Sequence, residues 1–161
     1  MNAATMQALR RLLFFSRPEA AALVGASMSR PRGVSDRAWR MFEAGELPVP
    51  GDIAERIVEL VRWRASALTA ADAQIDLMRQ RLPPGASFDL ALCWYESMGD
   101  WMTLPGREPI QFRPQQSVLA ELAARHGARM VRFDAHDYAH WLGGREDSEA
   151  MRAAWAGKTA G

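Results

Sequence analysis

The apolar residues near the start of the chain recur at the spacing of short amphipathic helices. In the first segment, which Asn2 can cap, these residues are Met6, Leu9, Leu12 and Leu13. Residues 16–19 then match the capping-box sequence S-x-x-E, with a proline in the first turn. These patterns predict two helices, the second of which covers residues 18–24 and ends at Gly25.

Residues 35–45 predict a third, shorter helix. Ser35 is a suitable N-cap, and Gly45 suits the left-handed position that follows the last turn. Two pairs of residues, each spaced three apart, define two faces of this helix. Trp39 and Phe42 share one face, and Arg37 and Arg40 share another. Because so short a helix must dock on its neighbours, we expect the aromatic pair in the core and the arginine pair at the surface. A surface guanidinium can bridge O6 and N7 of guanine in the major groove of DNA.

An extended corner with two prolines, residues 47–50, precedes a helix that begins at about Asp52. The buried side of this helix is expected to comprise Ile53, Ile57, Leu60, Val61 and Trp63. Four helices, with a short third one that follows a turn, predict a helix-turn-helix domain over residues 1–64.

Residues 65–86 are predicted to form a helical connector. A second capping-box sequence at residues 69–72 leaves two possibilities, a helix that continues from Asp52 or one that restarts there. The Pro-Pro-Gly sequence within residues 83–87 predicts the clearest boundary in the chain.

Beyond this boundary the pattern predicts a compact dimerisation unit over residues 87–143 that contains a short sheet, so the fold class of the chain is α+β. Strands are expected at residues 88–95, 109–113 and 129–133, and helices at residues 97–104, 115–126 and 134–142. So small a sheet leaves strand edges and apolar surface that a two-fold partner can cover, which favours a homodimer. Residues 144–161 are predicted to be a flexible tail.

Charge is distributed unevenly along the chain. Residues 1–40 carry seven arginines against Glu19 and Asp36, a balance of +5, whereas the whole chain carries +1. The remaining residues therefore sum to −4. A basic N-terminal region on a mildly acidic body is typical of a DNA-binding face held by a domain that does not bind DNA.

Several classes of protein are disfavoured by what the sequence lacks. The single cysteine, Cys93, rules out an internal disulfide framework and a cysteine-based zinc cluster, and it fits a reducing cytoplasm. No apolar stretch reaches the length of a transmembrane helix, and the N-terminus does not resemble a signal peptide. We therefore expect a cytoplasmic protein that does not contact a membrane.

A pair of histidines could indicate a metal site. His136 and His140 lie four residues apart on a predicted helix, a spacing that can share one metal ion. No third ligand is evident, however, and Asp134 and Asp137 are explained as the N-cap and the first-turn acid of that helix. We expect no metal and no cofactor.

Cys93 and His126 could indicate a nucleophile and its base. Cys93 lies within an apolar run, where a thiol is usually part of the core. No phosphate-binding loop, dinucleotide fingerprint or G-x-S-x-G sequence is present. We therefore expect a protein without catalytic residues.

The region around the third helix resembles a known family. The pattern S-x-R-x-W-x-x-[WF]-E-x-G, followed by x-x-x-V-P and a helix of D-x-A-E type, is similar to that of the YdiL-like helix-turn-helix proteins and the related anti-CRISPR-associated (Aca-type) autorepressors. The residues that carry the resemblance are Ser35, Arg37, Trp39, Phe42, Glu43, Gly45, Val49, Pro50, Asp52, Ala54 and Glu55. The resemblance extends more loosely to about residue 142, and it implies that the C-terminal domain mediates dimerisation.

Two features depart from the family pattern. Phe42 stands where a second tryptophan is usual. The turn before the third helix, residues 26–33, is also much longer than the resemblance implies, and it contains Arg30 and Arg32. These two arginines could contact phosphate or a minor groove, or they could be incidental residues of a solvated loop.

These observations predict a sequence-specific transcriptional regulator, a homodimeric repressor of its own operon that binds a palindromic operator in double-stranded DNA. The predicted DNA-binding residues are Ser35, Asp36, Arg37, Arg40, Arg17, Arg30 and Arg32. Among them, Arg37 and Arg40 would contact base edges, Ser35 a phosphate or a base, and the other arginines phosphates.

Alternatives remain at this point. Arg37 and Arg40 could instead form surface ion pairs with Asp36 and Glu43. Glu43 itself is expected to bond backbone or arginine side chains within the domain, because phosphate would repel it. Other candidate functions are an RNA-binding or dual DNA/RNA regulator and an antitoxin-like protein-interaction module.

Overall fold

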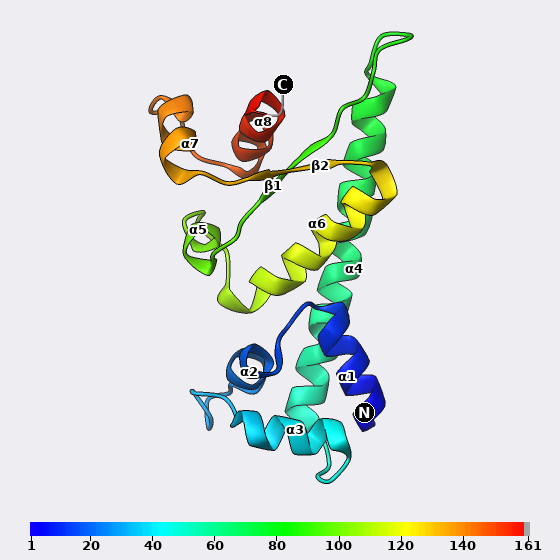
Figure 1. Cartoon of the computed structure of the whole chain (residues 1–161), viewed down its shortest axis with the longest axis vertical. Coiled ribbons are helices and arrows are strands. Elements are labelled where there is room, and N and C mark those ends of the chain that lie inside the picture. The colour runs from blue at the N-terminus through cyan, green and yellow to red at the C-terminus, as the bar shows by residue number, and fades with distance from the viewer. Residues whose placement is uncertain (160–161) are drawn as a thin grey trace. The chain divides into compact units, whose positions relative to one another are not determined.

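The computed structural model describes residues 1–159, which divide into two compact units (Figure 1). The N-terminal unit comprises residues 1–67 together with residues 113–117, and the C-terminal unit comprises residues 68–112 and the chain from residue 118 onward. The fold class is α+β, as predicted. No helix of the described chain is long and apolar enough to cross a membrane.

The N-terminal unit is all helical, and its helices begin and end close to the predicted residues. Its elements are α1 (Ala3–Leu12), α2 (Arg17–Glu19), the π-type turn η1 (Ala20–Val24) that continues α2, α3 (Asp36–Ala44) and the first part of α4 (Gly51–Gln80). Asn2 caps α1 by accepting a hydrogen bond from the backbone N–H of Thr5, at 2.8 Å. Ser16 and Glu19 form the reciprocal capping box at the start of α2. Local capping thus fixes where the first two helices begin.

The core of the N-terminal unit lies where α1, η1, α3 and α4 meet. Its buried apolar residues include Met6, Leu13, Phe15, Ala20, Ala21, Val24, Trp39, Phe42, Ile53, Ile57 and Leu60. The expected apolar side of α1 was partly wrong, because Leu12 is 39% exposed and Arg10 takes its place in the core. Arg10 can be buried there because an acidic partner on α3 neutralises it.

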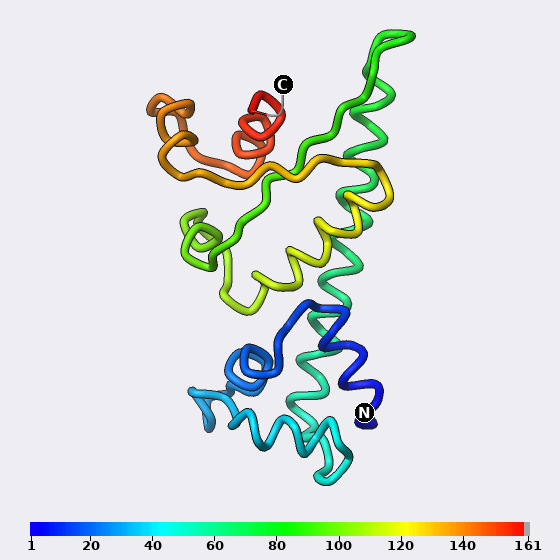
Figure 2. Tube along the Cα trace, in the orientation of Figure 1, coloured from blue at the N-terminus to red at the C-terminus, as the bar shows by residue number. Residues whose placement is uncertain are grey.

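Helix α4 is continuous from Gly51 to Gln80 and does not restart at the second capping-box sequence. Residues 52–80 contain neither glycine nor proline, so nothing interrupts the backbone hydrogen bonds of the helix. The helix ends just before Pro83, at the predicted boundary. Figure 2 follows the chain through this long helix and into the C-terminal unit.

The C-terminal unit contains a two-stranded parallel sheet and several helices. Its elements are the last part of α4, β1 (Ala91–Trp94), α5 (Met98–Met102), the 3-10 turn η2 (Pro109–Gln111), α6 (Phe112–His126) apart from residues 113–117, β2 (Arg129–Arg132), α7 (Ala135–Leu142) and α8 (Glu149–Thr159). The register pairs Ala91 with Arg129 and Trp94 with Arg132. The connection between the two strands passes through α5 and α6, as a parallel pair requires.

Residues 109–113 are not the edge strand that we expected. They form η2 and the start of α6, with Pro109 in the first turn and Phe112 buried. Proline fixes a backbone φ that suits the first turn of a helix as well as a strand, and the alternation over five residues could not separate the two.

Residues 144–161 are not a flexible tail over their described part. Helix α8 occupies Glu149–Thr159, and it buries Arg152, Trp155 and Ala156. The indole Nε1 of Trp155 donates to Asp137 at 2.7 Å, which ties α8 to α7. The last two residues, 160–161, lie outside the described chain.

An aromatic cluster forms the core of the C-terminal unit. It contains Cys93, Tyr95, Trp101, Phe112, Phe133, Tyr138 and Trp155. The guanidinium of Arg152 lies among the rings, 4.8 Å from the centroid of Phe133, and donates to Asp147 at 2.5 Å. This ion pair lets α8 bury a charged residue within an apolar core.

Candidate nucleic-acid interface

Helix α3 is built from local signals that the sequence carries. The hydroxyl oxygen of Ser35 accepts from the backbone N–H of Ala38 at 3.1 Å and so caps the first turn. Gly45 ends the helix with a φ of 76°, a conformation that favours glycine. Trp39 is completely buried and Phe42 is 6% exposed, so the predicted core face of α3 is confirmed.

Glu43 clamps the buried face of α3 to α1. Arg10 donates to the Glu43 carboxylate through Nε at 2.5 Å and through its second terminal nitrogen at 3.2 Å, and Trp39 Nε1 donates to the same carboxylate at 2.9 Å. The remaining Arg10 nitrogen donates to the carbonyl of Phe15 at 2.7 Å. Burial opposes the charge of Glu43, but the bonds from Arg10 and Trp39 outweigh it and hold its pKa below the usual value. The expected internal role of Glu43 is therefore confirmed, and it does not pair with Arg37 or Arg40.

The opposite face of α3 presents its two arginines to solvent. Arg37 is exposed, and within residues 1–159 its guanidinium has no hydrogen-bond or ion-pair partner. Arg40 forms an ion pair with Asp36 one turn earlier, at 2.9 Å, and the two side chains are 56% and 39% exposed. An exposed pair of this kind contributes less than about 1 kcal/mol, so a phosphate or a base can displace Asp36.

The three other predicted arginines differ in their surroundings. Arg17 is exposed at the start of α2, and its charge helps to lower the pKa of Glu43. Arg32 is exposed in the long turn, with no ion-pair partner in the described chain. Arg30 is committed to the protein, because it donates to the carbonyl of Gly25 at 3.3 Å and to the carboxylate of Asp52. The structure thus leaves Arg17 and Arg32 available to a ligand and gives Arg30 a structural partner.

The long turn before α3 is a closed hairpin. Ser27 and Arg30 form an antiparallel bridge with two 3.0 Å backbone hydrogen bonds, and Gly33 N–H donates to the Arg30 carbonyl at 2.9 Å. The Val34 N–H then donates to the carbonyl of Ala21 on η1, also at 2.9 Å. The extra residues therefore form a closed loop between η1 and α3. The hydrogen bond from Val34 then fixes the start of α3 against η1.

Two glycines make this close return feasible. A Cβ added at Gly33 would lie 2.1 Å from the Ala21 carbonyl oxygen, and Gly33 also has a φ of +77°. A Cβ at Gly25 would lie 2.3 Å from the same oxygen. Only glycine lets the backbones of η1 and the turn approach this closely.

Asp52 and Arg56 support the turn before α3, a role that the sequence analysis did not identify. Both lie on α4, and both hold the hairpin: Asp52 binds Arg30, and Arg56 donates to the carbonyl of Ala26. Their spacing of four residues places them on the same face of the helix. That spacing was visible in the sequence, although nothing local indicated which surface the pair would contact.

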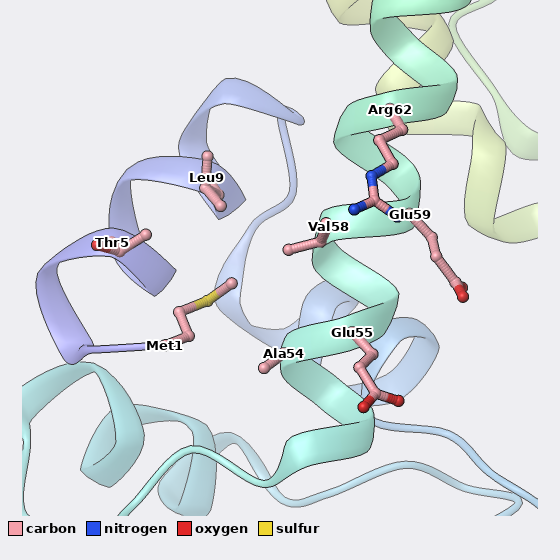
Figure 3. Close-up of a pocket in the computed structure, with 8 residues that line it drawn as sticks. All are labelled: Met1, Thr5, Leu9, Ala54, Glu55, Val58, Glu59 and Arg62. Atoms are coloured by element: carbon pink, nitrogen blue, oxygen red, sulfur yellow. The ribbon is translucent and has the colours of Figure 1, made fainter.

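A groove between α1 and α4 marks a different face of the N-terminal unit. Its volume is about 500 Å³, and Figure 3 shows apolar side chains from both helices within it, with Glu55 and Glu59 on the α4 side. The lining residues are Met1, Thr5, Leu9, Ala54, Glu55, Val58, Glu59 and Arg62. The charged side chains of the groove are two carboxylates and the guanidinium of Arg62, so it lacks the positive surface that the arginine face of α3 offers to phosphate.

Asp134 and Cys93, which the sequence analysis weighed beside the candidate metal-binding and nucleophilic residues, have structural roles. Asp134 caps α7 by accepting from the backbone N–H groups of His136 and Asp137, both at 2.9 Å. No group of three or more His, Cys, Asp or Glu side chains within residues 1–159 could hold a metal ion. Burial raises the pKa of the Cys93 thiol to about 11, so this thiol is protonated at neutral pH.

The imidazole of His126 is paired with Asp72 and not with Cys93. Its Nε2 lies 2.7 Å from a carboxylate oxygen of Asp72 on α4. Among the causes that lower the pKa of Asp72, the hydrogen bond with His126 is the largest. His126 thus joins the end of α6 to α4 within the C-terminal unit.

Comparisons with known proteins identify the family of this chain. A model of the family described as Aca2/YdiL-like matches residues 1–131, which include all the helices of the N-terminal unit. The chain is also similar to the Aca2 repressor of Pectobacterium phage ZF40, with 29% identity over 116 residues that cover 71% of this chain and 86% of that protein. The protein belongs to the Aca2/YdiL-like family.

Proposed function

We propose that the protein is a transcriptional repressor that binds a palindromic operator in double-stranded DNA as a homodimer. The observation that carries the proposal is the construction of α3. Arg10 and Glu43 hold one face of this helix against α1, and the opposite face presents Arg37 and Arg40 to solvent. A short helix with a fixed orientation and exposed arginines matches the requirements of a recognition helix in a major groove. The relation to a protein named a repressor supports the direction of regulation.

Arg37 is the residue best placed to contact a base edge. It lies in the first turn of α3, the part of a recognition helix that reaches furthest into the groove, and its guanidinium has no partner in the described chain. A bidentate arginine–guanine contact contributes about 1–3 kcal/mol of discrimination against another base. Arg40 lies one turn later and would release Asp36 to bind the DNA. Breaking this ion pair costs little free energy because both side chains are exposed.

Ser35 and the start of α2 supply phosphate contacts. The Ser35 oxygen accepts from Ala38, which leaves its hydroxyl hydrogen free to donate to a phosphate oxygen. Arg17 is exposed at the start of α2, where it would contact a second phosphate when α3 lies in the major groove. These contacts orient the domain on the duplex without reading its sequence.

The C-terminal unit is the proposed dimerisation domain. Each strand of its two-stranded sheet has one unpaired edge, and Met130 on β2 is 38% exposed. An exposed edge and an exposed apolar side chain suit contact with a second copy of the chain. Two recognition helices would then contact half-sites about 10 bp apart, one turn of B-DNA.

Selection of duplexes from a random-sequence pool by the full-length protein tests the proposal. We expect enrichment of an inverted repeat, and a complex of two protein chains per duplex by analytical ultracentrifugation. Competition with a matched pool of RNA hairpins should leave the DNA complex intact. Failure to enrich any duplex sequence, or displacement of the DNA by RNA at equal concentration, would overturn the proposal.

A further inference from the structure

The hairpin of residues 26–32 carries an apolar side chain that packs against nothing. Met28 is 103% exposed, whereas the next most exposed large apolar side chain of the described residues, Leu77, is 46% exposed. Exposed methionines usually lie flat on a surface and keep part of their area covered, because burying apolar area is favourable. Met28 instead projects from the tip of the hairpin into solvent.

The hairpin that carries Met28 is fixed at its base. The backbone bridge between Ser27 and Arg30 closes it, and Ser27 and Ser29 share a hydrogen bond of 3.1 Å across its tip. Arg30 binds Asp52, and Arg56 binds the carbonyl of Ala26, so two α4 side chains hold the base of the hairpin. A projection held in this way loses little conformational entropy when it contacts a ligand.

The position of the hairpin relates it to the DNA proposed for α3. The hairpin ends at residue 33, and Ser35 caps α3. The hairpin therefore comes directly before the N-terminal end of α3, which carries Arg37. The tip of the hairpin, residues 28–29, is a tight turn, and Figure 1 shows the segment between α2 and α3 beside the start of α3. If the start of α3 enters a major groove, a turn beside it lies near the sugar-phosphate backbone that separates this groove from the neighbouring minor groove.

We propose that the hairpin is a second DNA-contacting element, with Met28 entering the minor groove beside each half-site and Arg32 contacting a backbone phosphate. This inference rests on the proposed DNA binding by α3. Methionine is among the apolar side chains that wedge between base steps in a minor groove and unstack them. Arg32 is exposed beside the tip and lacks an ion-pair partner in the described chain, so it can supply the charge that such an approach needs.

A fluorescent base analogue tests the wedge directly. The probe is the duplex selected by the protein, with 2-aminopurine placed in turn at each step of the sequence that flanks a half-site. The wild-type protein should raise the fluorescence at one flanking step, because unstacking relieves quenching. Met28→Ala should abolish this rise while the complex still forms. Met78→Ala, which alters an exposed methionine on α4, should retain the full rise.

Salt dependence tests the contribution of Arg32. Arg32→Ala should reduce the slope of log affinity against log salt by about 1, the value for one lost phosphate contact.

Hydroxyl-radical footprinting gives a second test of Met28. It should show protection of minor-groove sugars in the flank with the wild-type protein and loss of that protection with Met28→Ala.

The outcomes separate this inference from the proposed function. If Met28→Ala binds the duplex with the wild-type footprint and fluorescence, the hairpin is not a DNA-contacting element, although α3 still is. If the wild-type protein selects no duplex at all, the proposed function has failed instead. Because Met28 contacts no core residue, its substitution should leave the midpoint of thermal unfolding unchanged, which shows that lost unstacking is not a folding defect.

Discussion

Removal of the Glu43 carboxylate should strongly destabilise the N-terminal unit. Glu43→Ala leaves the guanidinium of Arg10 with the Phe15 carbonyl as its one remaining partner of those described above. Stranding one member of a buried ion pair costs about 3–5 kcal/mol. The side chains of Arg10 and Glu43 are 10% and 5% exposed, so solvent cannot compensate the charge that remains.

Two further variants separate the charge from the packing. Glu43→Gln keeps an acceptor for Arg10 or Trp39 but loses the charge, so it should cost about 1.5–3 kcal/mol, the contribution of a hydrogen bond to a charged group. The double substitution of Arg10→Met and Glu43→Met removes both charges. The double variant should recover much of the stability that Glu43→Ala loses, because replacing both members of a buried ion pair by apolar residues is often nearly neutral.

Urea unfolding followed by circular dichroism measures these free energies. Hydrogen exchange of the α3 backbone amides reports in addition whether the loss is local to this helix. A cost of less than about 1 kcal/mol for Glu43→Ala, or a double variant that is less stable than either single one, would show that the ion pair does not fix the orientation of α3.

Three other changes follow from the same structure. Gly33→Ala should destabilise the N-terminal unit by more than about 1 kcal/mol, seen as a lower urea midpoint, because its Cβ meets the Ala21 carbonyl at a positive φ; an unchanged midpoint would contradict the observed turn. Trp155→Ala should cost about 3–5 kcal/mol and lower the midpoint of the C-terminal unit, whereas a flexible tail would tolerate it. In the folded protein the pKa values of Glu43 and Glu19 lie below 4.5, the usual value for glutamate. Both carboxylates therefore contribute stability above that pH, and this stability is lost as the pH falls through the folded-state pKa values. Stability measured from pH 6 to pH 3 should therefore fall, and the fall should be smaller in Glu43→Gln.

Signals that act within a few residues made the helices of the N-terminal unit predictable. Ser16 with Glu19, and Ser35 with Gly45, mark helix ends through bonds that span three or four residues. The aromatic spacing of Trp39 and Phe42 likewise identified the core face of α3. Such patterns can be read without knowing where the rest of the chain lies.

The features that the sequence did not reveal depend on partners far along the chain. Arg30 binds a carboxylate 22 residues away, and Arg56 binds a carbonyl 30 residues away, so the closed hairpin had no local signature. Trp155 reaches Asp137 across 18 residues, and without that contact the alanine- and glycine-containing C-terminus reads as a tail. Local periodicity cannot report such contacts because it records only which residues share a face.

A loss-of-contact experiment asks whether α3 reads DNA through Arg37. Affinities of the wild-type protein and of Arg37→Ala are measured for the selected duplex and for duplexes substituted at each base pair of one half-site. Arg37→Ala should lose about 5- to 150-fold in affinity for the selected duplex and become indifferent to one guanine position alone. Arg62→Ala, which alters an exposed arginine of the groove between α1 and α4, should match the wild-type protein at every position. Equal sensitivity of Arg37→Ala and the wild-type protein to all base substitutions would show that Arg37 does not read a base.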